Sequence, residues 1–177
     1  QGQIPLAETV AAFERLRADG KIVRWGVSNF DTAAMRELFA FAEGRRCATN
    51  QVLYHLRERG IEWDLLPWLR ERRIPVMAYS PLGKGALLRD PKLASIGRRC
   101  GATPAQIALR WLLRAPGVVA IPESADRAHI RANRDAASLR SSAALRCSLS
   151  PNSSALARAR PVARGTPQTR NAATISR

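Results

Sequence analysis

No stretch of the sequence approaches the roughly 20 consecutive apolar residues that a membrane-spanning helix requires. The first residues, Gln1 to Pro5, contain neither a basic segment nor an apolar core, so we expect no signal peptide. They also lack an initiator methionine and lead almost at once into a helical pattern. We therefore expect a cytoplasmic protein without membrane contacts, in a chain that is a fragment of a longer one.

Cysteines are few and isolated. Cys47, Cys100 and Cys147 lie far apart and form no Cys-x-x-Cys pair. This odd, widely spaced set indicates neither a disulfide framework nor the ligand spacing of a zinc site. We expect reduced thiols and no bound metal.

Acidic and aromatic residues are absent from the end of the chain. Residues 137–177 contain seven arginines, and most of the remainder is Ser, Ala, Pro, Thr and Asn. Such a segment cannot bury enough apolar surface to offset the entropy of ordering it, so we expect a disordered basic tail. The abrupt change of composition near Ala137 suggests a reading-frame change in a GC-rich gene.

The net charge of +15 raises the alternative of nucleic-acid binding. The tail's seven arginines leave +8 for residues 1–136, where the charges are spread along predicted helix faces. A basic tail binds phosphate polymers without sequence preference, but this one has no aromatic side chains to stack on bases. Nucleic-acid binding is therefore the weaker interpretation.

Residues 1–136 show helical periodicity that alternates with short apolar runs. The runs predict strands at residues 22–27, 49–53, 76–79 and 118–121. Asp31 and Asp64 are placed to cap helices, and Thr103 to Gln106 reads as a capping box with proline at the first helical position. Nearly continuous apolar strands are typical of a parallel sheet covered by helices.

The predicted order is one helix and then four strand–helix units. Polar residues follow each strand, and parallel α/β proteins place their sites at that rim. A closed (β/α)₈ barrel needs eight strands and about 250 residues. Four units therefore predict either an open doubly wound sheet or half of a barrel.

Four segments resemble, in order and spacing, the second half of an aldo-keto reductase. They are GKIVRWGVSNF at 20–30, NQVLY at 50–54, PVMAYSPLG at 75–83 and GATPAQIALRWL at 101–112. The resemblance covers about residues 4–135. It implies that residues 1–136 are the C-terminal half of a TIM (β/α)₈ barrel. It also implies hydride transfer from NAD(P)H to an aldehyde or ketone, a small-molecule carbonyl substrate.

The resemblance also implies a nicotinamide site. Ser28, Asn29 and Gln51 match the contacts to the carboxamide, whose donors and acceptors suit hydroxyl and amide side chains. Tyr79 matches the aromatic residue that stacks on the nicotinamide ring. Each also has an ordinary structural interpretation: a turn or helix cap for the Ser-Asn pair, a satisfied buried amide for Gln51, and core packing for Tyr79.

Two further segments match the rest of the cofactor. Ser80, Leu82 and Gly83 match the loop that receives the pyrophosphate, where glycine allows close approach of the backbone. At the adenosine end the family contacts fall on a second set of residues: Ser124, His129 and Asn133.

The adenosine end departs from the family pattern. Glu123 stands where the family has a lysine that pairs with the 2′-phosphate of NADP(H), and Ala132 replaces a customary glutamate. His129 stands where the family has arginine. A carboxylate repels the 2′-phosphate but accepts a hydrogen bond from a free ribose hydroxyl. NADP(H) is therefore the cofactor that the family implies, and NAD(H) is the alternative.

The resemblance assigns no catalytic residue to this chain. The family's Asp, Tyr, Lys and His come from the first half of the barrel, where the Tyr protonates the carbonyl oxygen. Tyr54 and Tyr79 match other family positions, and neither His55 nor His129 matches the catalytic histidine. We expect a fragment that is inactive alone. The alternative is a non-catalytic cofactor-binding or regulatory subunit, because this superfamily also contains channel-associated subunits.

Overall fold

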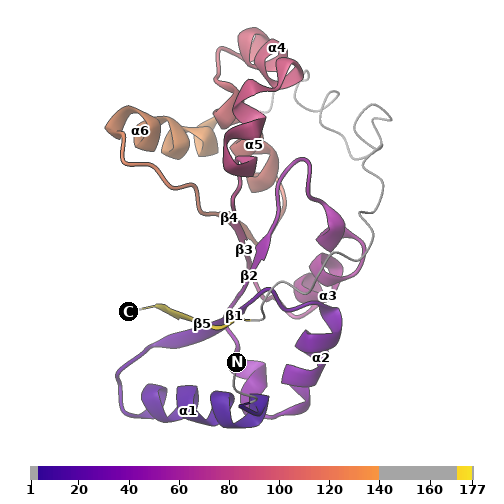
Figure 1. Cartoon of the computed structure of the whole chain (residues 1–177), viewed down its shortest axis with the longest axis vertical. Helices are drawn as coiled ribbons and strands as arrows, with labels where there is room; N and C mark the ends of the chain where they lie inside the picture. The colour runs from indigo at the N-terminus through magenta and orange to yellow at the C-terminus, as the bar shows by residue number, and fades with distance from the viewer. Residues whose placement is uncertain (1–3, 140–170, 177) are drawn as a thin grey trace. The chain divides into compact units, whose positions relative to one another are not determined.

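The computed structural model describes residues 4–139 and 171–176 (Figure 1). The chain folds into two compact units. The described residues of the first unit are 4–52, 61–77 and 171–176, and those of the second unit are 53–60 and 78–139. Strand β3, Val76–Tyr79, contributes its first two residues to the first unit and its last two to the second.

The elements alternate between strand and helix, as the sequence predicts. Up to the start of β3 they are α1 (Leu6–Ala18), β1 (Arg24–Ser28), α2 (Thr32–Ala40), the 3-10 helix η1 (Glu43–Arg46), β2 (Asn50–Leu53), the 3-10 helix η2 (Gly60–Glu62) and α3 (Leu65–Glu71). After β3 come the 3-10 helix η3 (Gly83–Arg89), α4 (Pro91–Cys100), α5 (Pro104–Leu113), β4 (Val118–Ala120), α6 (Arg127–Asp135) and the 3-10 helix η4 (Ala136–Ser138).

The strands are ordered β4-β3-β2-β1-β5, and β1 to β4 are parallel. Between β1 and β2, Val27 lies opposite Asn50 and Ser28 opposite Gln51. This register places the end of β1 beside the start of the parallel strand β2. The four predicted strands are confirmed, with bounds that differ by one or two residues.

Helix α1 packs on β1 through an aromatic pair and a half-buried carboxylate. The rings of Phe13 and Trp25 stack with centroids 5.5 Å apart. Trp25 is 2% exposed and donates its indole N–H to Oε1 of Glu14 at 2.8 Å. Arg17 and Arg46 also donate to Glu14, so a carboxylate next to the apolar core is held by three donors.

Helix α5 organises the second unit. Thr103 and Gln106 form the predicted capping box, and Nε2 of Gln106 donates to the backbone oxygen of Ala132 at 3.2 Å, which ties α5 to α6. The buried side of α5 includes Trp111, whose ring lies 5.5 Å from that of Tyr54. The local cap therefore fixes where the helix starts, and the aromatic pair fixes what it packs against.

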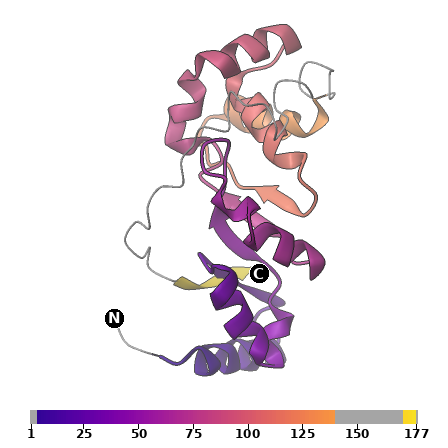
Figure 2. The same ribbon diagram turned by 90° about the vertical axis from the view of Figure 1, so that its right-hand side faces the viewer.

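A fifth strand, β5 (Asn171–Ser176), pairs antiparallel with β1 (Figure 2). Ile175 lies opposite Trp25 and Thr174 opposite Gly26. An unpaired edge strand presents free N–H and C=O groups that another strand can satisfy. These six residues thus have regular structure where the sequence predicts disorder. Residues 140–170 and 177, the rest of the expected disordered tail beyond Leu139, lie outside the described part.

None of the helices within residues 4–139 is long and apolar enough to cross a membrane. The same residues and β5 contain no group of three His, Cys, Asp or Glu side chains arranged to hold a metal ion. Cys47 is buried and donates to the backbone oxygen of Thr49 at 3.3 Å, and burial raises the pKa of its thiol to about 11.

Candidate functional site

Three of the expected cofactor residues meet where the end of β1 lies beside the start of β2, in the first unit. The hydroxyl of Ser28 donates to the backbone oxygen of Gln51 at 3.1 Å. The backbone N–H of Asn29 donates to the same oxygen at 2.8 Å. One carbonyl therefore accepts from both residues and fixes their positions relative to Gln51.

The backbone turns sharply where β1 ends. Asn29 has φ of +58°, a left-handed conformation that Asn tolerates better than most residues. Ser28 is 9% exposed, whereas Asn29 and Gln51 are half-buried. The strand end therefore presents two amide side chains around a buried hydroxyl.

Asn50 supports this turn, and the sequence interpretation gave it no role. Its side chain is fully buried, and Nδ2 donates to the backbone oxygen of Phe30 at 2.8 Å. Within the described residues its Oδ1 has no hydrogen-bond partner. The signal in the sequence is an asparagine at the start of a predicted strand, where a buried amide must find partners.

Tyr79 and the loop at Ser80, Leu82 and Gly83, which we expect to receive the pyrophosphate, lie in the second unit. Tyr79 is half-buried at the end of β3, and burial raises the pKa of its hydroxyl. Ser80 follows with φ of +48°, and its carbonyl accepts the N–H of Gly83 at 2.8 Å. The strand therefore leads directly into a tight turn.

The turn continues through three left-handed residues. Gly83, Lys84 and Gly85 have φ of 58°, 51° and 88°. Leu82, just before them, has φ −102° and ψ 12°. A right-handed residue followed by a left-handed one brings successive N–H groups toward one side, the backbone arrangement called an anion-binding nest.

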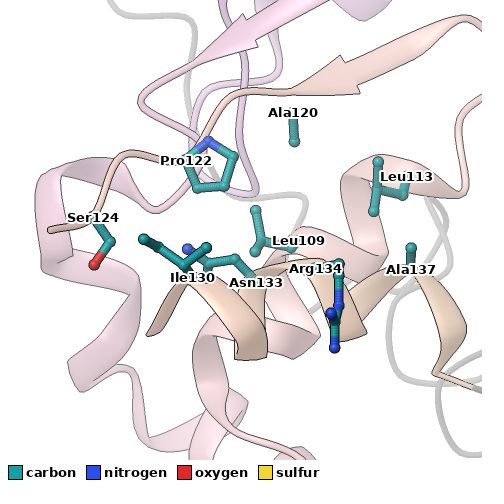
Figure 3. A pocket seen from close by; sticks show the side chains of 9 residues that line it. All are labelled: Leu109, Leu113, Ala120, Pro122, Ser124, Ile130, Asn133, Arg134 and Ala137. Atoms are coloured by element: carbon teal, nitrogen blue, oxygen red, sulfur yellow. The ribbon is translucent and has the colours of Figure 1, made fainter. Parts of the chain in front are cut away.

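Ser124 and Asn133 line one pocket of about 360 Å³ in the second unit (Figure 3). In Figure 3, Ser124, Ile130 and Asn133 lie at one end of the pocket, and Arg134 and Ala137 at the other. The remaining lining comes from α5, β4 and the segment after β4: Leu109, Leu113, Ala120 and Pro122. The walls are thus mainly apolar, with a hydroxyl, an amide and a guanidinium among them.

The segment between β4 and α6 is ordered by local caps. Oδ1 of Asp126 accepts the N–H groups of Ala128 at 2.7 Å and His129 at 3.0 Å. These two hydrogen bonds lower the pKa of Asp126. The hydroxyl of Ser124 in turn accepts the N–H of Asp126 at 3.1 Å. Ser124 is therefore held by the helix that carries Asn133.

The structure does not gather all of the expected adenosine residues. His129 lies exposed on α6 and does not line the pocket, and Glu123 is exposed. Arg134 does line it, although the sequence interpretation passed over it. The sequence did contain a signal for Arg134: it lies four residues after Ile130, and residues four apart share one face of a helix.

Comparison with known proteins identifies the family. Residues 1–144 match the model of the aldo/keto reductase family. The methylglyoxal reductase YeaE of Escherichia coli is 50% identical over 137 residues, which cover 75% of this chain and 48% of that protein. The glyoxal reductase of Bacillus subtilis is 37% identical over 134 residues, covering 76% and 47%.

A solved structure shows the same likeness. The crystal structure of an aldo-keto reductase from Klebsiella pneumoniae in complex with NADPH superposes with a TM-score of 0.79 and 47% identity. That superposition covers 84% of this chain and 54% of the other. The chain spans about half the length of the curated relatives that it matches. Its fold and its sequence agree: this chain belongs to the aldo/keto reductase family.

Proposed function

We propose that the chain carries the cofactor-binding residues of an NADP(H)-dependent reductase that transfers hydride to small aldehydes or ketones. The observation that carries this proposal is the meeting of Ser28, Asn29 and Gln51 where the end of β1 lies beside the start of the parallel strand β2. Relatives named as methylglyoxal and glyoxal reductases support small dicarbonyl compounds as the substrate class. The NADPH complex of the Klebsiella protein supports the cofactor.

In the first unit, we assign Ser28, Asn29 and Gln51 to the nicotinamide carboxamide. The hydrogen of the Ser28 hydroxyl is committed to the backbone oxygen of Gln51. Its lone pairs therefore remain as acceptors, which suit the NH₂ group of the carboxamide. The amide side chains of Asn29 and Gln51 supply both donors and acceptors for its remaining hydrogen bonds.

In the second unit, we assign Tyr79 to stacking on the nicotinamide ring and the following turn to the pyrophosphate. The half-buried phenol ring offers a flat apolar face at the end of β3. Because the N–H of Gly83 already donates to the carbonyl of Ser80, we assign the phosphate oxygens to the other N–H groups of the nest at Leu82 and Gly83, together with the hydroxyl of Ser80. The bound cofactor supplies the hydride, and these residues bind and orient it.

We assign the pocket that holds Ser124 and Asn133 to the adenosine moiety. Its apolar walls suit an adenine ring, and the amide of Asn133 can hydrogen-bond to the ring edge. Glu123 next to this segment disfavours the 2′-phosphate of NADPH by charge repulsion, whereas Arg134 in the lining attracts it. A shift toward NAD(H) therefore remains our alternative for the cofactor.

We further propose that the four strand–helix units are the C-terminal half of the family's (β/α)₈ barrel. The order of the four motifs and the half-length coverage of the relatives support this. None of the family's catalytic Asp, Tyr, Lys and His can be assigned to a residue here, so we expect the chain to catalyse no reduction by itself. The same observation favours the second candidate, a non-catalytic cofactor-binding subunit.

The test is titration of the 177-residue chain with NADPH and with NADH, with binding measured by the fluorescence of the cofactor. We expect saturable, weak binding and no oxidation of NADPH when methylglyoxal is added. Turnover of methylglyoxal would overturn the assignment of an inactive chain. Absence of saturable binding to either cofactor would overturn the cofactor site itself.

A further inference from the structure

A small hairpin follows β2 in the second unit. The N–H of His55 donates to the carbonyl of Glu58 at 3.1 Å, and the N–H of Glu58 donates back to the carbonyl of His55 at 2.9 Å. Two reciprocal bonds across so short a loop fix the backbone of the residues between them. The side chains of His55 and Arg57 therefore leave the hairpin in defined directions.

The imidazole of His55 is buried and its protonation state follows from its contacts. The residue is 8% exposed, and Nδ1 accepts the backbone N–H of Arg57 at 3.2 Å. An accepting Nδ1 carries no proton, so the neutral ring has its hydrogen on Nε2. Burial lowers the pKa of His55, which favours this neutral form.

The far edge of this ring lies against the glycine turn. A Cβ placed on Gly83 would lie 3.6 Å from Cε1 and 3.7 Å from Nε2 of His55, which is ordinary van der Waals contact. The same Cβ would lie 3.4 Å from Cγ of Leu87, a residue that is 1% exposed. His55 and Leu87 therefore border the side of the left-handed Gly83 on which a side chain would stand.

The hairpin also holds the other end of the same loop. Nη2 of Arg57 donates to Oδ2 of Asp90 at 2.9 Å. The other oxygen of Asp90 caps α4 by accepting the N–H groups of Lys92 at 2.9 Å and Leu93 at 3.4 Å. Burial opposes ionisation of Asp90, but the hydrogen bonds from Arg57 and these two amides outweigh it and lower its pKa.

These contacts lie near the two ends of the stretch from Ser80 to Asp90. The proposed function assigns the first residues of this stretch to the pyrophosphate. The stretch contains the 3-10 helix η3 and further backbone bonds at both of its ends. Besides the bond from Gly83 to Ser80, the N–H groups of Gly85 and Leu87 donate to the carbonyl of Leu82, at 3.1 and 3.4 Å, and that of Asp90 donates to the carbonyl of Leu87 at 3.3 Å. Ser80 and Lys84 are nonetheless non-glycine residues with positive φ, an uncommon backbone conformation, and the contacts from His55 and Arg57 add external support to these internal bonds.

We propose that the His55–Glu58 hairpin is a brace that positions the Ser80–Asp90 loop to bind a diphosphate group, with His55 and Arg57 as its two positioning residues. His55 supports the turn at Gly83 from beneath, and Arg57 anchors Asp90 where the loop joins α4. Neither residue is assigned to the ligand itself. Pre-ordering the loop lowers the entropic cost of binding, which is why loss of the brace weakens affinity. The ligand identity rests on the proposed function, but the brace does not.

Four variants distinguish the support from His55 and the support from Arg57 from a general effect of changing the hairpin. His55→Asn keeps an acceptor for the N–H of Arg57 and removes the ring edge that contacts Gly83. Arg57→Ala removes the anchor at Asp90, and Arg57→Lys keeps a charge there as the conservative rescue. Glu58→Ala is the matched control, because this exposed side chain lies in the same hairpin while only its backbone makes the bridge.

The first measurement is amide hydrogen exchange in the full chain, without ligand. We expect about tenfold faster exchange at Gly83, Gly85 and Leu87 in His55→Asn and Arg57→Ala, because these amides exchange through local opening of the loop. Arg57→Lys should restore most of the protection, and Glu58→Ala should leave it unchanged. Unchanged exchange in both brace variants overturns the proposal. If His55→Asn does not fold, the comparison of Arg57→Ala with Arg57→Lys tests the proposal.

The second measurement compares NADPH with adenosine 2′-monophosphate, which lacks the diphosphate. The brace variants should weaken NADPH binding about five- to tenfold and leave the monophosphate unaffected, since the loop serves only the diphosphate. Equal weakening of both ligands indicates a general structural defect and overturns the positioning role. If the unmutated chain binds no NADPH, the proposed function fails, and exchange at the loop amides alone decides the brace.

Discussion

The hydroxyl of Ser28 and the backbone N–H of Asn29 converge on the backbone oxygen of Gln51, with the Ser28 Oγ to Gln51 O distance at 3.1 Å. This relationship exists because β1 and β2 are parallel and in register at Ser28 and Gln51. The sheet, rather than a flexible loop, therefore sets the spacing of these side chains. A site on rigid elements holds its groups more closely than a site on loops does.

Replacement of Ser28 by alanine should weaken cofactor binding more than it weakens the fold. The backbone oxygen of Gln51 keeps its bond from Asn29, so the free energy of unfolding should fall by only about 1 kcal/mol. NADPH affinity should fall about three- to tenfold through loss of an acceptor for the carboxamide. Urea unfolding and fluorescence titration measure the two effects. Unchanged affinity would remove Ser28 from the proposed site.

Glu14 should make the first unit sensitive to acid. The hydrogen bond from Arg17 is the main cause that lowers the pKa of Glu14 to about 2; burial opposes it, and Trp25 and Arg46 add to it. The carboxyl is ionised in the folded state well below its ordinary pKa near 4.5. Its contribution to stability is therefore complete above about pH 5 and is lost as the pH falls toward 2.

Glu14→Gln removes this dependence and serves as the matched variant. The amide still accepts one bond but carries no charge for the two arginines, so the loss near neutral pH should be about 1–2 kcal/mol. Urea unfolding at several pH values should show the unmutated chain losing its advantage over the variant between about pH 5 and 2. A difference that stays constant over that range would contradict the assigned role.

Glu123→Lys should shift cofactor preference toward NADPH. The substitution replaces a repelling carboxylate by an ammonium group next to the pocket that contains Ser124. Because position 123 is exposed, we expect a change of only about three- to tenfold in the ratio of the NADPH and NADH dissociation constants. Glu37→Lys on α2 makes the same change of charge outside the pocket lining, and so controls for the change in net charge. Equal ratios in both variants would show that Glu123 does not face the 2′ position.

Local sequence signals predicted the elements well because their causes are local. Asp31 accepts the N–H of Ala34 at 2.8 Å, and Thr103 and Gln106 form their capping box within one helical turn. Such caps need only residues three positions apart. The end of β1 is also legible from sequence, because its apolar run stops at Ser28 and Asn29; whether Ser28 and Gln51 bind a cofactor stays a prediction.

The missed features depend on contacts between distant segments. His55 meets Gly83, and β5 pairs with β1 from the other end of the sequence. No periodicity reports such pairings, because they follow from loop closure and packing. Arg134 was missed for a related reason: an arginine on a polar helix reads as solvent-exposed until the pocket beside it is seen.

The close approach of β1 and β2 gives a sharper test of the strand-end site. A Cβ on Gly26 would lie 2.6 Å from the backbone oxygen of Thr49 and 2.7 Å from its Cγ2. The backbone atom cannot move without parting the two strands, so Gly26→Ala should cost about 1–3 kcal/mol. It should also weaken NADPH binding, because the same register places Ser28 opposite Gln51.

Gly60→Ala is the control for this prediction. A Cβ there meets nothing within 4 Å and φ is not positive, so the substitution should be neutral or stabilise by up to about 1 kcal/mol. Urea midpoints and NADPH titrations of the two variants should therefore diverge, with both quantities falling only in Gly26→Ala. If Gly26→Ala lowers stability but leaves affinity intact, the strands can separate without disturbing the site, and the rigid spacing of Ser28 and Gln51 is not what binding requires.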